Sequence, residues 1–206
     1  MRRQLVCSAT ALALMIVSLD GAAAGSAHRQ LGAHEHGSGV LNVAIEGERV
    51  SLELAAPGSD IVGFEHAPRT DQQKAEYSKV GEKLRAGLKL FRLTPQAGCE
   101  LVETEIDYVT EAQAPNTDNT AAASETAHDH DGHEADSHDH DHDHAEFLVS
   151  YSIRCKAPSA LRGIAFDYFD VFSNAQRLQV NVVTPEGQMA FTASRDAPIL
   201  SFGDLN

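Results

Sequence analysis

The chain has 206 residues, and its 30 acidic against 16 basic side chains give a formal charge of −14 with histidine neutral. An acidic surface repels nucleic acids and anionic lipids and attracts cations, so no nucleic-acid partner is expected. The length suits a single domain.

Residues 1–24 predict a secretory signal peptide. Two arginines precede the apolar run Leu5–Leu19, and small residues follow it, which is the order of a basic region, a hydrophobic core and a cleavage site. Ala27 is the alternative cleavage point. The apolar run is shorter than the roughly 20 residues of a spanning helix. We therefore expect residues 28–206 in the periplasm, as one metal-binding domain without stable membrane insertion.

The first part of this domain predicts a hairpin followed by a helix. Apolar and polar residues alternate in Val40–Ile45 and Val50–Ala55, with a turn between them, as in strands with one buried face. A period near 3.6 then predicts a helix over about Thr70 to Phe91. Gly81 and Gly87 weaken its far end.

Two further strands are predicted to face each other, Cys99–Val109 and Glu146–Cys155. Apolar residues alternate through the second strand, and a bulge near Leu101 restores the alternation in the first. Cys99 and Cys155 are the cysteines left after signal cleavage. An even count in an exported chain favours a disulfide. Such a bond would raise the free energy of unfolding by about 4 kcal/mol, because it closes the long chain segment between the two cysteines. The alternative is a pair of thiolate metal ligands.

The C-terminal part again predicts strands. They lie within 162–172, in a hairpin of Leu178–Val183 and Gln188–Ala193, and in the short segment Ile199–Phe202. The fold class expected from the whole pattern is α+β. It is an antiparallel, β-rich single domain with one main helix and a long disordered histidine-rich loop, 111–145, inserted between two strands.

That loop carries the most specific chemical signal. Imidazole binds zinc, copper and nickel, and a histidine-rich tract predicts metal binding. Residues two apart in an extended chain point to the same side, so pairs of rings can close on one ion. Interleaved carboxylates attract cations, yet they also stabilise protonated imidazole, so binding should weaken as pH falls. The histidines are His128, His130, His133, His138, His140, His142 and His144.

The alternative for the loop is a solvated charged linker, and its residues do not select one metal, since intrinsic affinity favours copper over zinc. A second cluster comprises His34, His36, Glu65 and His66. It predicts an ordered site of histidines and a carboxylate. For the pair before the first strand the ligand role is favoured. For His66 alone, a turn histidine hydrogen-bonded to backbone is favoured. The chain has no HExxH segment and no nucleophile elbow, so no enzymatic activity is expected.

Four segments resemble the ZrgA family of periplasmic zinc-uptake proteins. They are Gly32–Gly37 (GAHEHG), Leu41–Gly47 (LNVAIEG), Gly63–Pro68 (GFEHAP) and Arg177–Gln188 (RLQVNVVTPEGQ). The resemblance covers nearly the whole mature chain. It implies that the metal is zinc and that the partner is an ABC-type zinc importer or its binding protein. It also gives more weight to His34, His36 and His66.

The function predicted from the sequence is zinc capture in the periplasm in support of high-affinity uptake. One alternative is a periplasmic buffer or efflux helper for copper, nickel or cobalt. Another is a structural or interaction protein whose histidine loop responds to pH. A metallohydrolase is the least favoured.

Overall fold

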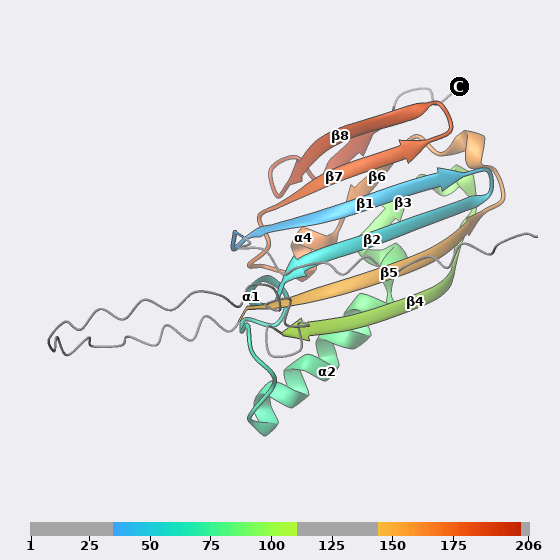
Figure 1. The fold of residues 1–206 in the computed structure, drawn as a ribbon. Helices are drawn as coiled ribbons and strands as arrows, with labels where there is room; N and C mark the ends of the chain where they lie inside the picture. Colours follow the sequence, from blue (N-terminus) through green and yellow to red (C-terminus); the bar gives the residue numbers. More distant parts are fainter. Residues whose placement is uncertain (1–34, 111–143, 203–206) are drawn as a thin grey trace, which may run out of the picture.

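A computed structural model of the chain describes residues 35–110 and 144–202. Six strands form one sheet in the order β4-β5-β2-β1-β7-β8 (Figure 1). These strands are β1 (Ser38–Glu46), β2 (Arg49–Pro57), β4 (Cys99–Thr110), β5 (Ala145–Cys155), β7 (Arg177–Thr184) and β8 (Gly187–Ser194).

A smaller sheet has the order β3-β6-β9, from β3 (Phe91–Leu93), β6 (Gly163–Phe166) and β9 (Ile199–Ser201). The helices are α1 (Gly58–Ile61), α2 (Asp71–Arg85), α3 (Gly87–Leu90) and α4 (Tyr168–Val171), with short 3-10 turns at Pro95–Ala97 and Pro158–Ala160. The described chain is therefore β-rich with few helices, as the sequence predicts.

The core lies between one face of the large sheet and the layer of helices and short strands behind it (Figure 1). Leu41 and Val43 of β1 point into this core and are almost fully buried, whereas Asn42 between them is not. This alternation is the period-2 pattern read from the sequence. Burial of each such side chain stabilises the fold by about 1.5–3 kcal/mol.

One strand pair departs from the expected antiparallel sheet. β1 pairs with β7 in parallel, while every other pair among the described strands is antiparallel. The two strands start side by side, because the carbonyl oxygen of Gly37 accepts hydrogen bonds from the amides of Gln176 and Arg177. Sequence alternation is the same for both directions, so the direction could not be predicted from it.

The predicted helix begins as expected but ends earlier. Thr70 caps α2 through a reciprocal capping box with Gln73, and α2 stops at Arg85 instead of continuing to Phe91. Gly87 lies against a ring of the sheet, and a Cβ at this position would be 2.5 Å from Tyr151. The helix is interrupted at Ala86, whose φ and ψ angles of −87° and 46° are not helical, and it resumes as α3 from Gly87 to Leu90. Phe91 is instead a fully buried residue of β3.

The expected strand within 162–172 is divided in the same way, because β6 ends at Phe166 and α4 follows. The pairing of β4 with β5 is confirmed, including the bulge between Leu101 and Glu103. The disulfide between Cys99 and Cys155 is confirmed too, so thiolate ligation by this pair is wrong.

No helix among the described residues is long and apolar enough to cross a membrane. The predicted signal peptide lies outside the described residues, and so does the predicted loop except for its last two positions. Ala145, the last residue of that loop as predicted, is buried and belongs to β5.

Candidate metal centre

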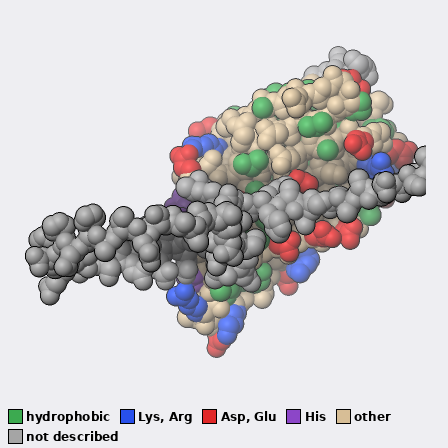
Figure 2. Space-filling model, in the orientation of Figure 1, with side chains coloured by type: hydrophobic (Ala, Val, Ile, Leu, Met, Phe, Trp, Pro, Cys, Tyr) green, Lys and Arg blue, Asp and Glu red, His purple; other side chains and the backbone are tan. Residues whose placement is uncertain are grey.

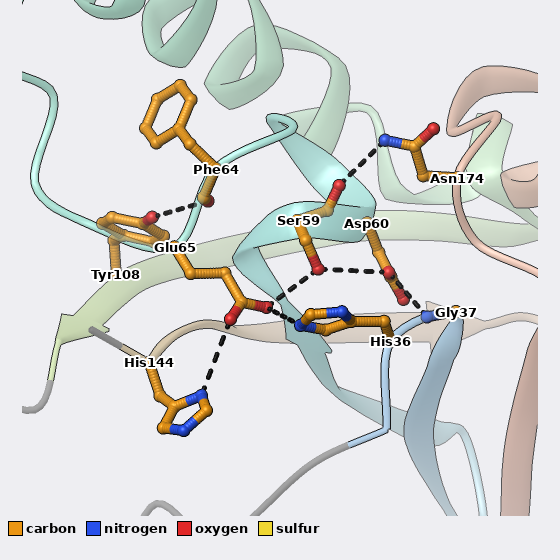
Figure 3. Close-up of polar contacts among 9 residues, drawn as sticks. All are labelled: His36, Gly37, Ser59, Asp60, Phe64, Glu65, Tyr108, His144 and Asn174. Carbon is orange, nitrogen blue, oxygen red and sulfur yellow. Dashed lines mark hydrogen bonds and ion pairs between the residues drawn. The ribbon is translucent and has the colours of Figure 1, made fainter. Parts of the chain in front are cut away.

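Three segments that are distant in the sequence meet at one end of the large sheet. β2 lies between β1 and β5, so its C-terminal end, where α1 begins, is flanked by the N-terminal ends of both neighbours. His36 precedes β1, Glu65 follows α1, and His144 precedes β5. Figure 3 shows the three side chains directed toward one another, and Figure 2 shows histidines gathered at this end of the molecule.

The carboxylate of Glu65 is the centre of these contacts. Its Oε1 atom lies 3.1 Å from Nε2 of His36 and accepts a hydrogen bond from Oγ of Ser59 at 2.8 Å. Its Oε2 atom lies 3.6 Å from Nδ1 of His144. The Glu65 side chain is 13% exposed and that of His36 is 67% exposed. A mostly buried carboxylate is thus contacted by two imidazoles from opposite sides.

The donor set suits a zinc ion. Zinc accepts imidazole nitrogen and carboxylate oxygen at about 2.0–2.2 Å in a tetrahedral shell, so neighbouring ligand atoms lie about 3.3–3.6 Å apart. The separation between Nε2 of His36 and Oε1 of Glu65 is close to this edge length, while Nδ1 of His144 lies 3.6 Å from the other carboxylate oxygen. Within residues 35–110 and 144–202, however, no three such side chains enclose an ion as they stand. Small side-chain rotations would have to close this cluster around a metal.

Asp60 lies beneath the cluster and is only 4% exposed. Its Oδ1 atom accepts a hydrogen bond from the amide of Gly37 at 2.7 Å and lies 3.5 Å from the hydroxyl of Ser59. Burial raises the pKa of Asp60, an effect that the Gly37 hydrogen bond and the nearby His36 oppose. The side chain of Asn174 donates to the carbonyl oxygen of Ser59 at 2.9 Å and so holds α1 from the opposite side.

Tyr108 fixes the segment that carries Glu65. Its hydroxyl lies 3.2 Å from the carbonyl oxygens of both Phe64 and His66. Burial raises the pKa of Tyr108 well above its usual value, so the phenol keeps its proton and donates it. Gly58 is required here, because a Cβ atom would lie 2.6 Å from the Phe64 oxygen and 2.9 Å from the Tyr108 hydroxyl.

His66 has other contacts. Its Nδ1 atom lies 2.9 Å from the carbonyl oxygen of Ala67, and its Nε2 atom is 3.4 Å from the side-chain nitrogen of Gln73 at the start of α2. Its ring stacks on Phe64. These contacts are those of a turn histidine that supports the start of α2. Its predicted role as a metal ligand stays a prediction.

The structure therefore brings together His36 and His144 from the predicted ligand set. Seven other predicted ligands lie outside the described residues, namely His34, His128, His130, His133, His138, His140 and His142. Cys99 and Cys155 are joined at the other end of β5.

Sequence reasoning treated His144 as one residue of the loop, and it did not single out Ser59 or Asp60. One sequence signal could have distinguished His144 from the other histidines of the loop. It stands directly before a strand of alternating apolar residues, and that strand fixes its backbone. No sequence signal distinguishes Asp60, which lies in the short segment between β2 and α2.

Comparison with known proteins agrees with this chemistry. A family model described as "ZrgA family zinc uptake protein" matches residues 33–202. No curated protein matches the chain.

Proposed function

Because this chain belongs to the ZrgA family of zinc uptake proteins, we propose that it binds zinc in the periplasm and supplies it to a high-affinity importer. The single observation that carries the proposal is the pair of imidazoles on the Glu65 carboxylate. His36, Glu65 and His144 would be three of the zinc ligands. His34, two residues before His36 in the sequence, is the predicted source of a fourth.

The histidine-rich segment would act as the collector. It leaves the sheet after Thr110 and returns at His144, and Thr110 is paired with Ala145 across β4 and β5. Both ends of the segment are thus fixed beside the ordered cluster. His144 is both the last histidine of the run and a member of the cluster. Zinc can pass from one to the other by exchange of one ligand at a time.

Metal capture of this kind needs no catalytic group. Zinc has no redox chemistry and accepts the nitrogen and oxygen donors present in the cluster. Imidazole binds the ion only when deprotonated, so release is favoured as the pH falls. The partner in the proposal is an ABC-type importer or its binding protein, which would take zinc by further ligand exchange.

The test is a competition titration of the mature protein against a zinc chelator. His36→Ala, Glu65→Gln and His144→Ala should each weaken the tightest site by more than about 100-fold, because even residues that only support a ligand cost 10–100-fold. Glu46→Gln, which alters an exposed carboxylate at the far end of β1, is the control and should leave affinity within about threefold. Equal affinity in all four variants and wild type would refute the site.

A second measurement tests the choice of metal and the direction of transport. A strain that lacks the protein should grow poorly under zinc limitation and normally under copper or nickel excess. The opposite pattern would support a role in metal tolerance and would contradict the proposal.

A further inference from the structure

The side chain of His36 is 67% exposed, so few packing contacts hold it. Its place in the cluster therefore depends on where the backbone puts its Cα atom. The amide nitrogen of Gly37 belongs to the same peptide plane as the carbonyl carbon of His36. Whatever holds this amide also holds the Cα of His36.

Both peptide groups around Gly37 are held. Its amide donates to Oδ1 of Asp60 at 2.7 Å, in a buried hydrogen bond. Its carbonyl oxygen accepts from the amides of Gln176 at 3.0 Å and Arg177 at 2.9 Å. The φ angle of Gly37 is +80°, a conformation that other residues rarely adopt. The turn that presents His36 is therefore pinned to α1 on one side and to the start of β7 on the other.

The Asp60 carboxylate is also connected, through Ser59, to Glu65, the second proposed ligand. The hydroxyl of Ser59 lies between Asp60 and Glu65, 3.5 Å from Oδ1 of the first and 2.8 Å from Oε1 of the second. The hydrogen-bonding partners of Asp60 are thus the backbone next to His36 and the side chain that contacts Glu65 (Figure 3).

We infer that Asp60 is a positioning residue of the zinc site, which sets the distance between His36 and Glu65 through the Gly37 amide and does not itself touch the ion. This inference rests on the proposed zinc site. Supporting residues of this type orient metal ligands in many proteins, and their loss weakens binding by about 10–100-fold. A short, buried hydrogen bond from a backbone amide to a side-chain oxygen is suited to that role, because it is directional.

The experiment compares two substitutions at Asp60 with a neighbouring control. Asp60→Ala removes the acceptor and should weaken the tightest zinc site by about 10–100-fold. Asp60→Asn keeps an oxygen acceptor of the same size at Oδ1 and should stay within about threefold of wild type. Tyr168→Phe removes a buried hydroxyl close enough to interact electrostatically with Asp60, yet it breaks no contact with Gly37 and should leave zinc affinity unchanged.

Two readouts separate positioning from general loss of stability. Urea unfolding in chelator gives the stability of each variant without metal. The visible spectrum of the cobalt-substituted protein reports the geometry around the ion and should change in Asp60→Ala but not in Asp60→Asn. If Asp60→Ala does not fold, Asp60→Ser, which leaves a shorter polar group in the same place, replaces it with the same expected loss.

Three outcomes are decisive against the inference. Wild-type affinity in folded Asp60→Ala shows that the contact does not position His36. A loss in Asp60→Asn as large as in Asp60→Ala shows that Asp60 is itself a zinc ligand. An unchanged cobalt spectrum in Asp60→Ala shows an effect on stability alone. Failure of the zinc site as a whole is distinguishable, because His36→Ala would then bind zinc as wild type does.

Discussion

The two ends of the β4–β5 pair differ in how they are held together. At one end a disulfide joins Cys99 to Cys155, and these residues are also partners in the strand register. At the other end the last pair is Thr110 with Ala145, and beyond it come His144 and the polar contacts of Glu65. The eleven residues of β5 separate the two ends by about 33 Å.

This difference shows how the fold accommodates its histidine-rich insertion. A covalent bond and a long ladder of hydrogen bonds stabilise the pair independently of residues 111–143. The proposed metal ligands lie at the other end, where the side chains of His36, Glu65 and His144 meet through polar contacts, so side-chain rotations on a held backbone can close them around an ion. Stability and binding should therefore respond separately to changes at the two ends, and the following predictions test that separation.

The largest effect on stability is expected at the disulfide end. Changing both Cys99 and Cys155 to Ser should lower the free energy of unfolding by about 4 kcal/mol, because the unfolded chain regains the freedom of a long loop. Zinc affinity should stay within about threefold of wild type. Urea unfolding and chelator competition give the two values, and a loss of zinc binding in the folded variant would contradict the separation.

A smaller loss is expected from Gly58→Ala at the metal end. The added methyl would lie 2.6 Å from the Phe64 oxygen, and relieving such overlap costs about 1–3 kcal/mol. The shift moves the segment that carries Glu65, so zinc affinity should fall as well. Gly81→Ala is the control, because a Cβ at Gly81 contacts only the end of the Arg85 side chain, at 3.3 Å. Equal zinc affinity in both variants would refute the coupling.

The pH dependence of stability should reveal the cost of burying Asp60. Its pKa is raised by burial, so the folded state keeps its proton to higher pH than the unfolded state does. Wild type therefore loses a stabilising contribution as the pH rises through the raised pKa, and Asp60→Asn does not. Measured in chelator, the stability of the variant relative to wild type should grow between pH 3.8, the ordinary pKa, and neutrality. A constant difference would contradict this.

The smallest change in stability is expected from shortening the insertion. Deletion of 126–143, which retains His144, should alter the free energy of unfolding by only about 0.5 kcal/mol, because loop entropy changes slowly with length. The number of zinc ions bound should fall, while the tightest site keeps its affinity. Calorimetry measures both quantities. An unchanged zinc count would show that the segment does not collect metal.

Much of the fold could be predicted from the sequence because burial on one face leaves a period of two. The β1–β2 hairpin, the β4–β5 pair with its bulge, and the β7–β8 hairpin all follow from that alternation. The predicted helix is interrupted at Ala86, which leaves the helical conformation, and the close contact of Gly87 with Tyr151 is a tertiary feature that local periodicity does not show. β3 was missed because the helical period was continued through Phe91.

The candidate site was predictable only in part. The sequence identified His36 and the Glu65–His66 segment through their residue types. It could not show which of these side chains would contact each other. His66 contacts Ala67 and Gln73, whereas Glu65 meets His36 and His144. Side-chain direction depends on the backbone of α1 and on Tyr108, which are brought there by long-range pairing.

By itself the sequence predicted the class of chemistry, because imidazole and carboxylate groups are ligands for divalent cations. It also predicted most strands of the large sheet, because alternation is a local property, and it favoured the disulfide through the even number of cysteines in the mature chain. Only the tertiary structure decided that three segments separated by many residues share one end of the sheet, and that a buried Asp60 lies beneath them. The physical reason is that strand order and the contacts of α1 arise from packing of the whole core, which no local pattern encodes.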